Sequence, residues 1–149
     1  MAVNAIPKGY HTMTPCLVAE GASKLIDFLK KAFEAEEIFR MARPDGGIMH
    51  AEIKIGDSMV MLGDATEQWK PITGAIYLYV NDADAVYKRA LQAGATSIME
   101  PVDQFYGDRH GGVKDPAGNI WWIATHKEDV PPDELKKRAE AFMTQQAQK

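Results

Sequence analysis

The amino-acid sequence predicts an α+β fold made of two consecutive βαβββ modules and a C-terminal helix. Three observations support this fold class. Short segments recur at an offset of 58 to 61 residues, so that His50-Ala-Glu-Ile-Lys54 returns as His110-Gly-Gly-Val-Lys114. Each copy carries one helical pattern among strand patterns, and a polar segment at residues 63–73 separates the copies. Two such modules are expected to form a curved mixed sheet with a cleft between them, and we expect the function to lie in that cleft.

The first module is expected over residues 10–62. Tyr10 to Val18 is predicted to be a strand, with Pro15 marking an edge or a bulge. Ala22 to Phe33 spaces its apolar side chains like an amphipathic helix. Because Glu34 is a poor residue for a left-handed cap, we expect this helix to run on or to end differently. Strands are predicted over residues 36–41, 48–55 and 58–62, joined by turns at Pro44-Asp-Gly-Gly47 and Gly56-Asp57.

The second module is expected over residues 74–126 and repeats this order. Gly74 to Val80 is predicted to be a strand, and Asn81 or Asp82 caps a helix that Gly94 ends. Strands are predicted over residues 96–102, 107–114 and 119–124, with a turn at Asp115-Pro-Ala-Gly118 before the last one. A C-terminal helix is expected over residues 131–145, packed on the body or on a neighbouring subunit. The 149 residues are expected to form a single domain.

Composition and charge exclude several classes of function. The chain has a formal net charge of −4 and no basic tail, which argues against a nucleic-acid or membrane-surface partner. Its single cysteine, Cys16, excludes an internal disulfide and a cysteine-based zinc site, and we expect it to be buried. The sequence shows no signal-peptide pattern and no apolar run of about 18 residues, so we expect a cytoplasmic protein.

Alternation along the strands sorts the side chains of each sheet into two faces. The face under the helix is expected to hold mainly aliphatic residues, such as Met49, Ala51, Ile53 and Ile55 of one strand. The opposite face is expected to hold His50, Glu52, Lys54, Met59, Met61, Tyr77, Tyr79, His110, Lys114 and Trp122. An aromatic and thioether lining of this kind suits a small planar or partly apolar ligand. The alternative is that this face is a subunit interface or is half solvated.

Several motifs of the chain resemble those of a known family. The tandem repeat that ends in Asp115-Pro-Ala-Gly-Asn-Ile120 resembles the vicinal oxygen chelate superfamily, whose members include glyoxalase I, bleomycin and fosfomycin resistance proteins and extradiol dioxygenases. Its PhnB-like branch is the closer match, over about residues 8–138. The motifs shared with that branch are Thr14-Pro15, Met49-His-Ala-Glu52, Ile55-Gly-Asp57, Gln104-Phe-Tyr-Gly-Asp-Arg109 and Thr125-His-Lys-Glu-Asp129. The resemblance implies a glyoxalase/bleomycin resistance-like fold and a homodimer, because such modules often pair across subunits, but it implies no particular reaction.

The resemblance also implies a metal site, whose usual ligands this sequence lacks. Metal enzymes of the family take one ligand from the first strand and one from the last strand of each module, and the last-strand ligand is usually Glu. The last-strand places here hold Met61 and Trp122, and the first-strand places hold Met13 or Thr14 and Ala75 or Tyr77. None of these side chains offers the imidazole or carboxylate that the usual divalent cations need. We therefore expect no inherited metal site and no cofactor.

Three functions remain open from the sequence. The first is a metal-free protein that binds a small, partly aromatic molecule in the cleft, with candidate ligand-binding residues Met59, Met61, Tyr77, Tyr79, Tyr106, Arg109 and Trp122. The second is a metal-dependent lyase, isomerase or dioxygenase, in which His50, Glu52 and His110 hold zinc, nickel, iron or manganese or act as acid and base. The third is a protein-interaction module with a closed cleft. Arg109 also has an alternative role, in a loop clamp with Asp108 at the rim.

Overall fold

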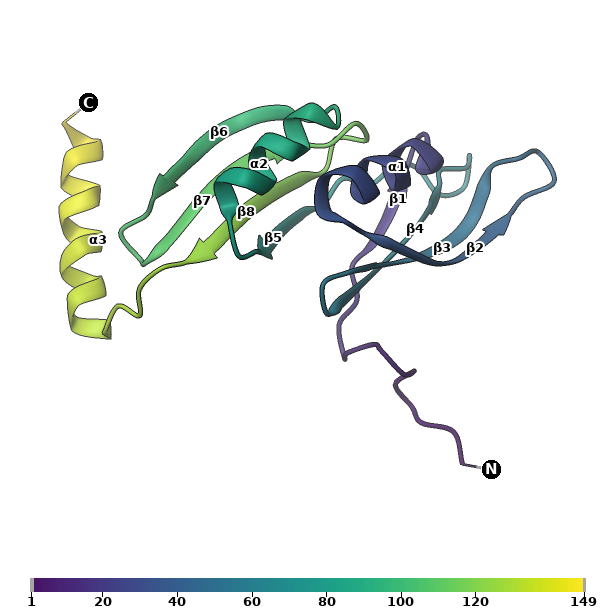
Figure 1. Cartoon of the computed structure of the whole chain (residues 1–149), viewed down its shortest axis with the longest axis horizontal. Coiled ribbons are helices and arrows are strands. Elements are labelled where there is room, and N and C mark those ends of the chain that lie inside the picture. The colour runs from purple at the N-terminus through teal and green to yellow at the C-terminus, as the bar shows by residue number, and fades with distance from the viewer. Residues whose placement is uncertain (1, 149) are drawn as a thin grey trace.

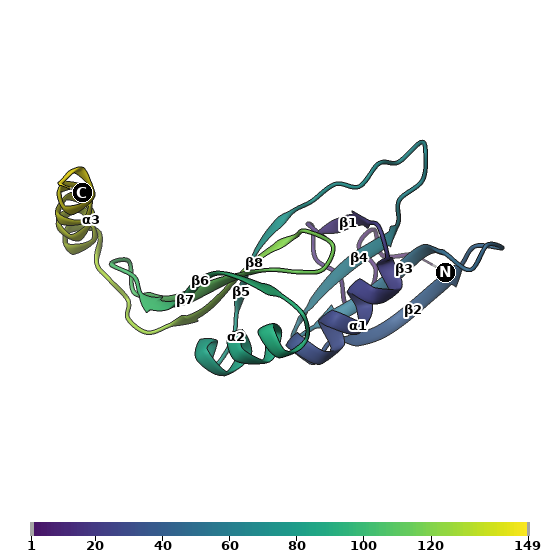
Figure 2. The same cartoon turned by 90° about the horizontal axis from the view of Figure 1, so that it is seen from above.

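The computed structural model describes residues 2–148 and confirms the α+β fold class. Two four-stranded mixed sheets lie side by side along the long axis of the molecule, and the C-terminal helix stands beyond the second sheet (Figure 1). The segment between the two sheets loops out from the body, as Figure 2 shows. None of the helices within residues 2–148 is long and apolar enough to span a membrane.

The first module follows the predicted order of one helix and four strands. Its elements are β1 (Cys16–Ala19), α1 (Ala22–Phe33), β2 (Glu36–Ala42), β3 (Ile48–Ile55) and β4 (Ser58–Asp64). The sheet order is β1-β4-β3-β2, in which β1 runs parallel to β4 and the other pairs are antiparallel. The amphipathic spacing of α1 buries one face of this helix on the sheet, including the fully buried Leu25, Ile26 and Leu29.

The second module repeats this topology. Its elements are β5 (Ala75–Tyr79), α2 (Ala83–Gln92), β6 (Thr96–Asp103), β7 (Asp108–Lys114) and β8 (Ile120–His126), and α3 (Pro132–Ala147) follows. The sheet order is β5-β8-β7-β6, with β5 parallel to β8. As the sequence predicts, Asp82 caps α2: its carboxylate accepts a hydrogen bond from the backbone N–H of Ala85 at 3.1 Å.

The two modules meet through their helices and share one core. α1 contacts α2, and the rings of Phe33 and Trp121 lie 4.9 Å apart across the junction. Arg89 of α2 donates from Nε to the carbonyl oxygen of Ala32 at 2.8 Å. Because both helices occupy this junction, each sheet keeps its other face free of helices. We call that face of each sheet its open face.

Each module ties the start of its helix to the end of its last strand. Asp64 accepts hydrogen bonds from the backbone N–H groups of Ala22 at 2.8 Å and Ile48 at 2.7 Å. At the equivalent place of the second module, Thr125 accepts from the N–H of Ala83 at 2.8 Å. In both ties the two residues are 42 positions apart, so the internal repeat of the sequence is also seen in these tertiary contacts. Each satisfies a backbone donor that a helix start leaves without a partner.

The structure overturns several local expectations in the first module. The first strand begins at Cys16, which is exposed rather than buried. Glu34 does adopt the left-handed conformation, with φ 56°, because the chain must reverse at once into β2. Met49 is exposed, since a register shift between Met41 and Ala42 gives the buried place to Ile48.

Candidate functional site

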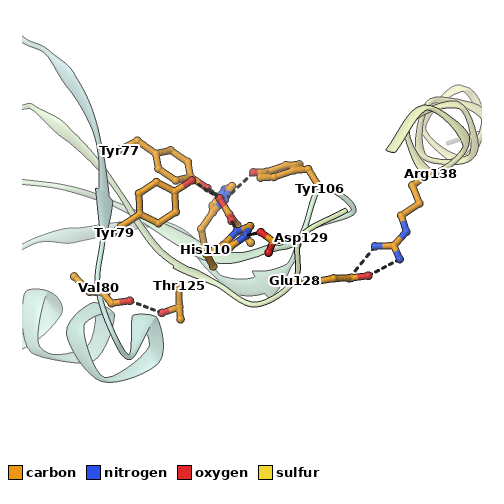
Figure 3. Close-up of polar contacts among 11 residues, drawn as sticks. Tyr77, Tyr79, Val80, Tyr106, His110, Thr125, Glu128, Asp129 and Arg138 are labelled. Carbon is orange, nitrogen blue, oxygen red and sulfur yellow. Dashed lines mark hydrogen bonds and ion pairs between the residues drawn. The ribbon is translucent and has the colours of Figure 1, made fainter. Parts of the chain in front are cut away.

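The open face of the second sheet carries a group of aromatic side chains. Tyr77 and Tyr79 come from β5, His110 from β7 and Trp122 from β8, and strand alternation points all four away from α2. Tyr106, from the turn before β7, approaches His110 from the other side (Figure 3). We call these five residues the aromatic cluster. Its position confirms the predicted facing of the four strand residues.

Asp108 lies within the cluster and is the acceptor that holds it together. Its side chain is 5% exposed. Oδ2 accepts hydrogen bonds from the hydroxyls of Tyr77 at 2.8 Å and Tyr79 at 2.9 Å, and Oδ1 lies 2.7 Å from His126 Nδ1. Burial by itself raises the pKa of Asp108, but the hydrogen bonds from His126, Tyr77 and Tyr79 outweigh burial and lower it. Asp108 is therefore ionised at neutral pH.

His110 is the buried imidazole at the centre of the cluster. Its Nδ1 lies 3.0 Å from the hydroxyl of Tyr77 and 2.8 Å from that of Tyr106 (Figure 3). Its ring meets the indole of Trp122 edge-on, with centroids 5.6 Å apart. Burial lowers the pKa of His110, and the nearby charge of Asp108 only partly opposes this, so the ring is neutral at neutral pH.

His126 links the cluster to the segment that leads into α3. Its Nδ1 contacts Asp108 and its Nε2 lies 2.7 Å from Asp129 Oδ1. Hydrogen bonds to both carboxylates, Asp108 first, raise the pKa of His126. The side chain of His126 is 48% exposed, yet both ring nitrogens are engaged.

Trp122 lies flat on β7 because Gly112 leaves room for it. A Cβ atom at Gly112 would lie 2.4 Å from Cζ3 and 2.6 Å from Cε3 of Trp122. The indole is partly exposed on its other side. The ring is thus a platform held between the strand below and solvent above.

The rim of the cluster is packed against α3. Phe105 stacks edge-on against Tyr106 at 5.2 Å and packs against Phe142 of α3 at 5.1 Å. Arg138 of α3 pairs with Glu128 at 2.8 Å (Figure 3) and donates to the carbonyl oxygen of Phe105 at 3.3 Å. α3 therefore supports the loop that carries Tyr106.

Two hollows lie between the modules. A groove of about 940 Å³ runs between the β3–β4 turn and the start of α2 and includes Lys54, Tyr77 and Tyr79 in its lining. A smaller, mainly apolar pocket of about 220 Å³ is lined by Met59 and Tyr77 and is covered by residues 11 to 15. Tyr77 borders both hollows as well as the aromatic cluster.

The candidate residues of the first module lie on the open face of their own sheet. Met61 is half-buried beside its partner Glu52. His50 Nε2 lies 3.8 Å from Glu52 Oε2, and Glu52 also accepts a hydrogen bond from Tyr10. His50, Glu52 and Met61 line neither hollow, whereas Lys54 and Met59 each line one together with Tyr77. The structure therefore gathers only part of the predicted lining between the modules of a single chain.

Arg109 lies on the opposite face of β7 from the cluster. Its guanidinium donates from Nε and Nη2 to Asp84 of α2 at 2.7 and 2.9 Å, and it reaches Asp103 at 3.3 Å. Asp108 and Arg109 point to different faces because they are neighbours in one strand. The expected clamp between them is wrong, and Arg109 fastens α2 to the sheet instead.

The donor set of the predicted relocated metal site does not converge. Within residues 2–148, no three His, Cys, Asp or Glu side chains are grouped so that they could hold a metal ion. His50 and Glu52 belong to the first sheet, whereas the neighbours of His110 are phenols and an indole. Within one chain, these residues therefore do not meet around a common cation.

Sequence reasoning missed Asp108 and His126 as members of the site. Asp108 was assigned to a loop clamp with Arg109, although the predicted strand 107–114 includes it. β7 starts with Asp108, which gives it the facing of His110. Asp108 lies two residues before His110 in the same strand, so the alternation of side chains already predicts that both point to one face. His126 needed the pairing of β7 with β8, because it lies opposite Asp108 in that ladder.

A family model matches most of the chain. Residues 11–123 match the model described as "Glyoxalase/Bleomycin resistance protein/Dioxygenase superfamily". Uncharacterized proteins of Mycobacterium bovis and Mycobacterium tuberculosis strain H37Rv are each 38% identical over 149 residues. The match covers 91% of this chain, 94% of the M. bovis protein and 84% of the M. tuberculosis protein.

Solved structures share the fold at low sequence identity. TioX from Micromonospora sp. ML1 is 24% identical, with a TM-score of 0.67, over 78% of this chain and 98% of TioX. The PhnB protein from Bacillus cereus is 18% identical, with a TM-score of 0.64, over 77% of this chain and 99% of that protein. These likenesses concern the fold alone.

Proposed function

The chain belongs to the glyoxalase/bleomycin resistance protein/dioxygenase superfamily, and from this premise we propose that it binds a small, partly aromatic molecule on its aromatic cluster, without the metal site of the family's metal enzymes. Membership alone names no ligand, because one fold carries many chemistries. The proposal therefore depends on the residues of this chain.

The observation that carries the proposal is the aromatic cluster itself. Tyr77 is 39% exposed and Tyr79 is 61% exposed, although exposing large apolar rings to water is energetically unfavourable. Hydrogen bonds to Asp108 hold both hydroxyls in place, and close packing against Gly112 holds Trp122 in place. A rigid, partly exposed set of rings loses little entropy when a flat ligand stacks on it.

The chemistry of the side chains supports binding without a metal. The two last-strand places where family metal enzymes usually carry Glu hold Met61 and Trp122. A thioether is a poor ligand for hard or borderline divalent cations, and an indole has no lone pair with which to bind a metal ion. The set His50, Glu52 and His110 offers suitable donors but not in one place.

We further propose that the protein is a homodimer whose second copy covers the open faces and completes the cleft. Phe39, Met41 and Val102 lie on these faces and are 42%, 45% and 45% exposed. Exposed apolar residues on two neighbouring sheet faces are typical of an interaction surface. Sedimentation equilibrium should show a dimer, which Met41→Lys weakens and Ile72→Lys, in the exposed linker, leaves intact. A monomeric wild-type protein would remove this proposal.

Ligand binding can be tested through the three indole N–H signals of the protein. We expect titration with 2-naphthol to shift the signal of Trp122 saturably, while those of Trp69 and Trp121 serve as internal references. Trp122→Ala should abolish binding measured by calorimetry, whereas Trp69→Ala, which removes an exposed indole far along the linker, should keep it. Equal affinities of the two variants would contradict a site on Trp122.

The absence of nucleic-acid or membrane partners is predicted from the net charge, and a cytoplasmic location is predicted from the lack of a signal-peptide pattern. No observation favours the enzyme or the protein-interaction module over small-molecule binding.

A further inference from the structure

We propose that the aromatic cluster selects planar ligands that carry an acidic O–H or ring N–H, and that Nε2 of His110 is the atom that accepts this hydrogen bond. This inference rests on the proposed binding function and adds the chemical class of the ligand. It follows from counting the protons in the network around Asp108.

The first step is the proton of Tyr77. Its hydroxyl has one proton and two neighbours, Asp108 Oδ2 at 2.8 Å and His110 Nδ1 at 3.0 Å. Placing the proton toward His110 would set the lone pairs of the phenol against an ionised carboxylate. A charge-assisted hydrogen bond is the stronger of the two choices, so the proton of Tyr77 goes to Asp108.

The second step is the tautomer of His110. With the proton of Tyr77 committed, its oxygen can only accept from Nδ1. A bare Nδ1 could accept only the proton of Tyr106, at 2.8 Å, and would then face the oxygen of Tyr77 lone pair to lone pair at 3.0 Å. Nδ1–H instead faces an accepting oxygen on both phenols and leaves no such repulsion. A neutral imidazole carries one proton, so the other nitrogen, Nε2, is left as an acceptor. Burial, which lowers the pKa of His110, favours this neutral form.

The third step is access to Nε2. None of the hydrogen bonds among the described residues involves Nε2 of His110. No side-chain nitrogen or oxygen in this part of the chain is both fully buried and without a partner. Nε2 therefore keeps some contact with solvent, although the residue as a whole is 8% exposed. A small opening of this kind admits the edge of a planar ligand more readily than a bulky group.

The other polar atoms of the cluster point to the same ligand class. The hydroxyls of Tyr77 and Tyr79 both donate their protons to Asp108, so each can only accept a hydrogen bond from a ligand. The only hydroxyl proton of the cluster not drawn to Asp108 is that of Tyr106. The charge of Asp108 opposes an anionic ligand, because the balancing His126 is shared with Asp129. The cluster is thus rich in acceptors and suits a ligand that donates.

The tautomer can be tested without any ligand. Long-range nitrogen–proton correlation spectra of the wild-type protein at neutral pH distinguish the two ring nitrogens of each histidine. We expect His110 to be protonated on Nδ1, and Tyr77→Phe to shift the population toward Nε2–H, because the phenol oxygen that holds the Nδ1 proton is gone. A wild-type His110 protonated on Nε2 would overturn the inference.

Ligand selectivity is tested with a matched pair, 2-naphthol and 2-methoxynaphthalene, which differ in the donor proton. We expect calorimetry to give about tenfold tighter binding of the naphthol, the effect of one net hydrogen bond. His110→Phe, which keeps a ring but removes Nε2, should bring the ratio to about one. Equal binding of both compounds to the wild-type protein would overturn the inference and leave the binding function standing. Binding of neither compound would overturn both.

Discussion

Replacing Gly112 by Ala should destabilise the protein only while Trp122 is present. The new methyl group would lie 2.4 and 2.6 Å from two ring carbons of Trp122, whereas carbon atoms in ordinary contact lie about 3.5–4.0 Å apart. The indole must therefore move by roughly 1 Å or more, toward solvent. Gly112 lies in the regular strand β7 and outside the left-handed region, so its backbone accepts Ala without strain.

The magnitude follows from two opposing effects. Overpacking typically costs about 1–3 kcal/mol. Ala in place of Gly restricts the unfolded chain and stabilises by about 0.4–1 kcal/mol. We expect a net loss of about 1–2 kcal/mol in the free energy of unfolding of Gly112→Ala. In a Trp122→Ala background the clash is absent, and the same substitution should be neutral or stabilising by up to about 1 kcal/mol.

The assay is a double-mutant cycle of equilibrium urea unfolding, followed by far-ultraviolet circular dichroism because the indole itself is changed. The coupling free energy between Gly112 and Trp122 should be about 1–3 kcal/mol. Gly112→Ala should also weaken 2-naphthol binding, since the platform is displaced. If Gly112→Ala costs the same stability in both backgrounds, Trp122 does not rest on Gly112 and the platform argument fails.

Three further substitutions test the network and the frame around it. Asp108→Asn should lower the free energy of unfolding by about 1–3 kcal/mol in urea titrations at neutral pH, because three hydrogen-bond donors lose their buried, ionised acceptor; an unchanged midpoint would refute the acceptor role. The difference in free energy of unfolding between wild type and His126→Gln should be largest below the ordinary histidine pKa. It should shrink as the pH rises through the raised pKa of folded His126. A pH-independent difference would show that the imidazole is not charged. Asp64→Ala and Thr125→Ala, the two helix ties, should each cost about 1 kcal/mol, as loss of a helix cap does; a cost for one tie alone would contradict their equivalence.

How much of the site could be predicted follows from the range of each interaction. Tyr77, His110 and Trp122 were placed on one face correctly, since alternation in a strand is a local property. Asp108 was missed because it was interpreted as part of a loop clamp, although it lies within the predicted strand 107–114 and alternates with His110. The partner of Arg109 was also beyond prediction: Asp84 lies 25 residues away on a helix, and nothing local distinguishes it from Asp108.

The cleft shows the same division. Sequence patterns identified two modules and the residues facing away from each helix. They did not show that, of the predicted lining, only Lys54, Met59, Tyr77 and Tyr79 would border the hollows between the modules of one chain.

The sequence by itself determined the repeated βαβββ order, the faces of the strands and the absence of the usual metal ligands at Met61 and Trp122. These properties depend on residue type and on spacing within one element. Only the tertiary structure decided that Asp108, Tyr77 and His110 form one proton network and that Trp122 rests on Gly112. Such contacts join three strands, and their distances depend on register and twist, which no single segment encodes.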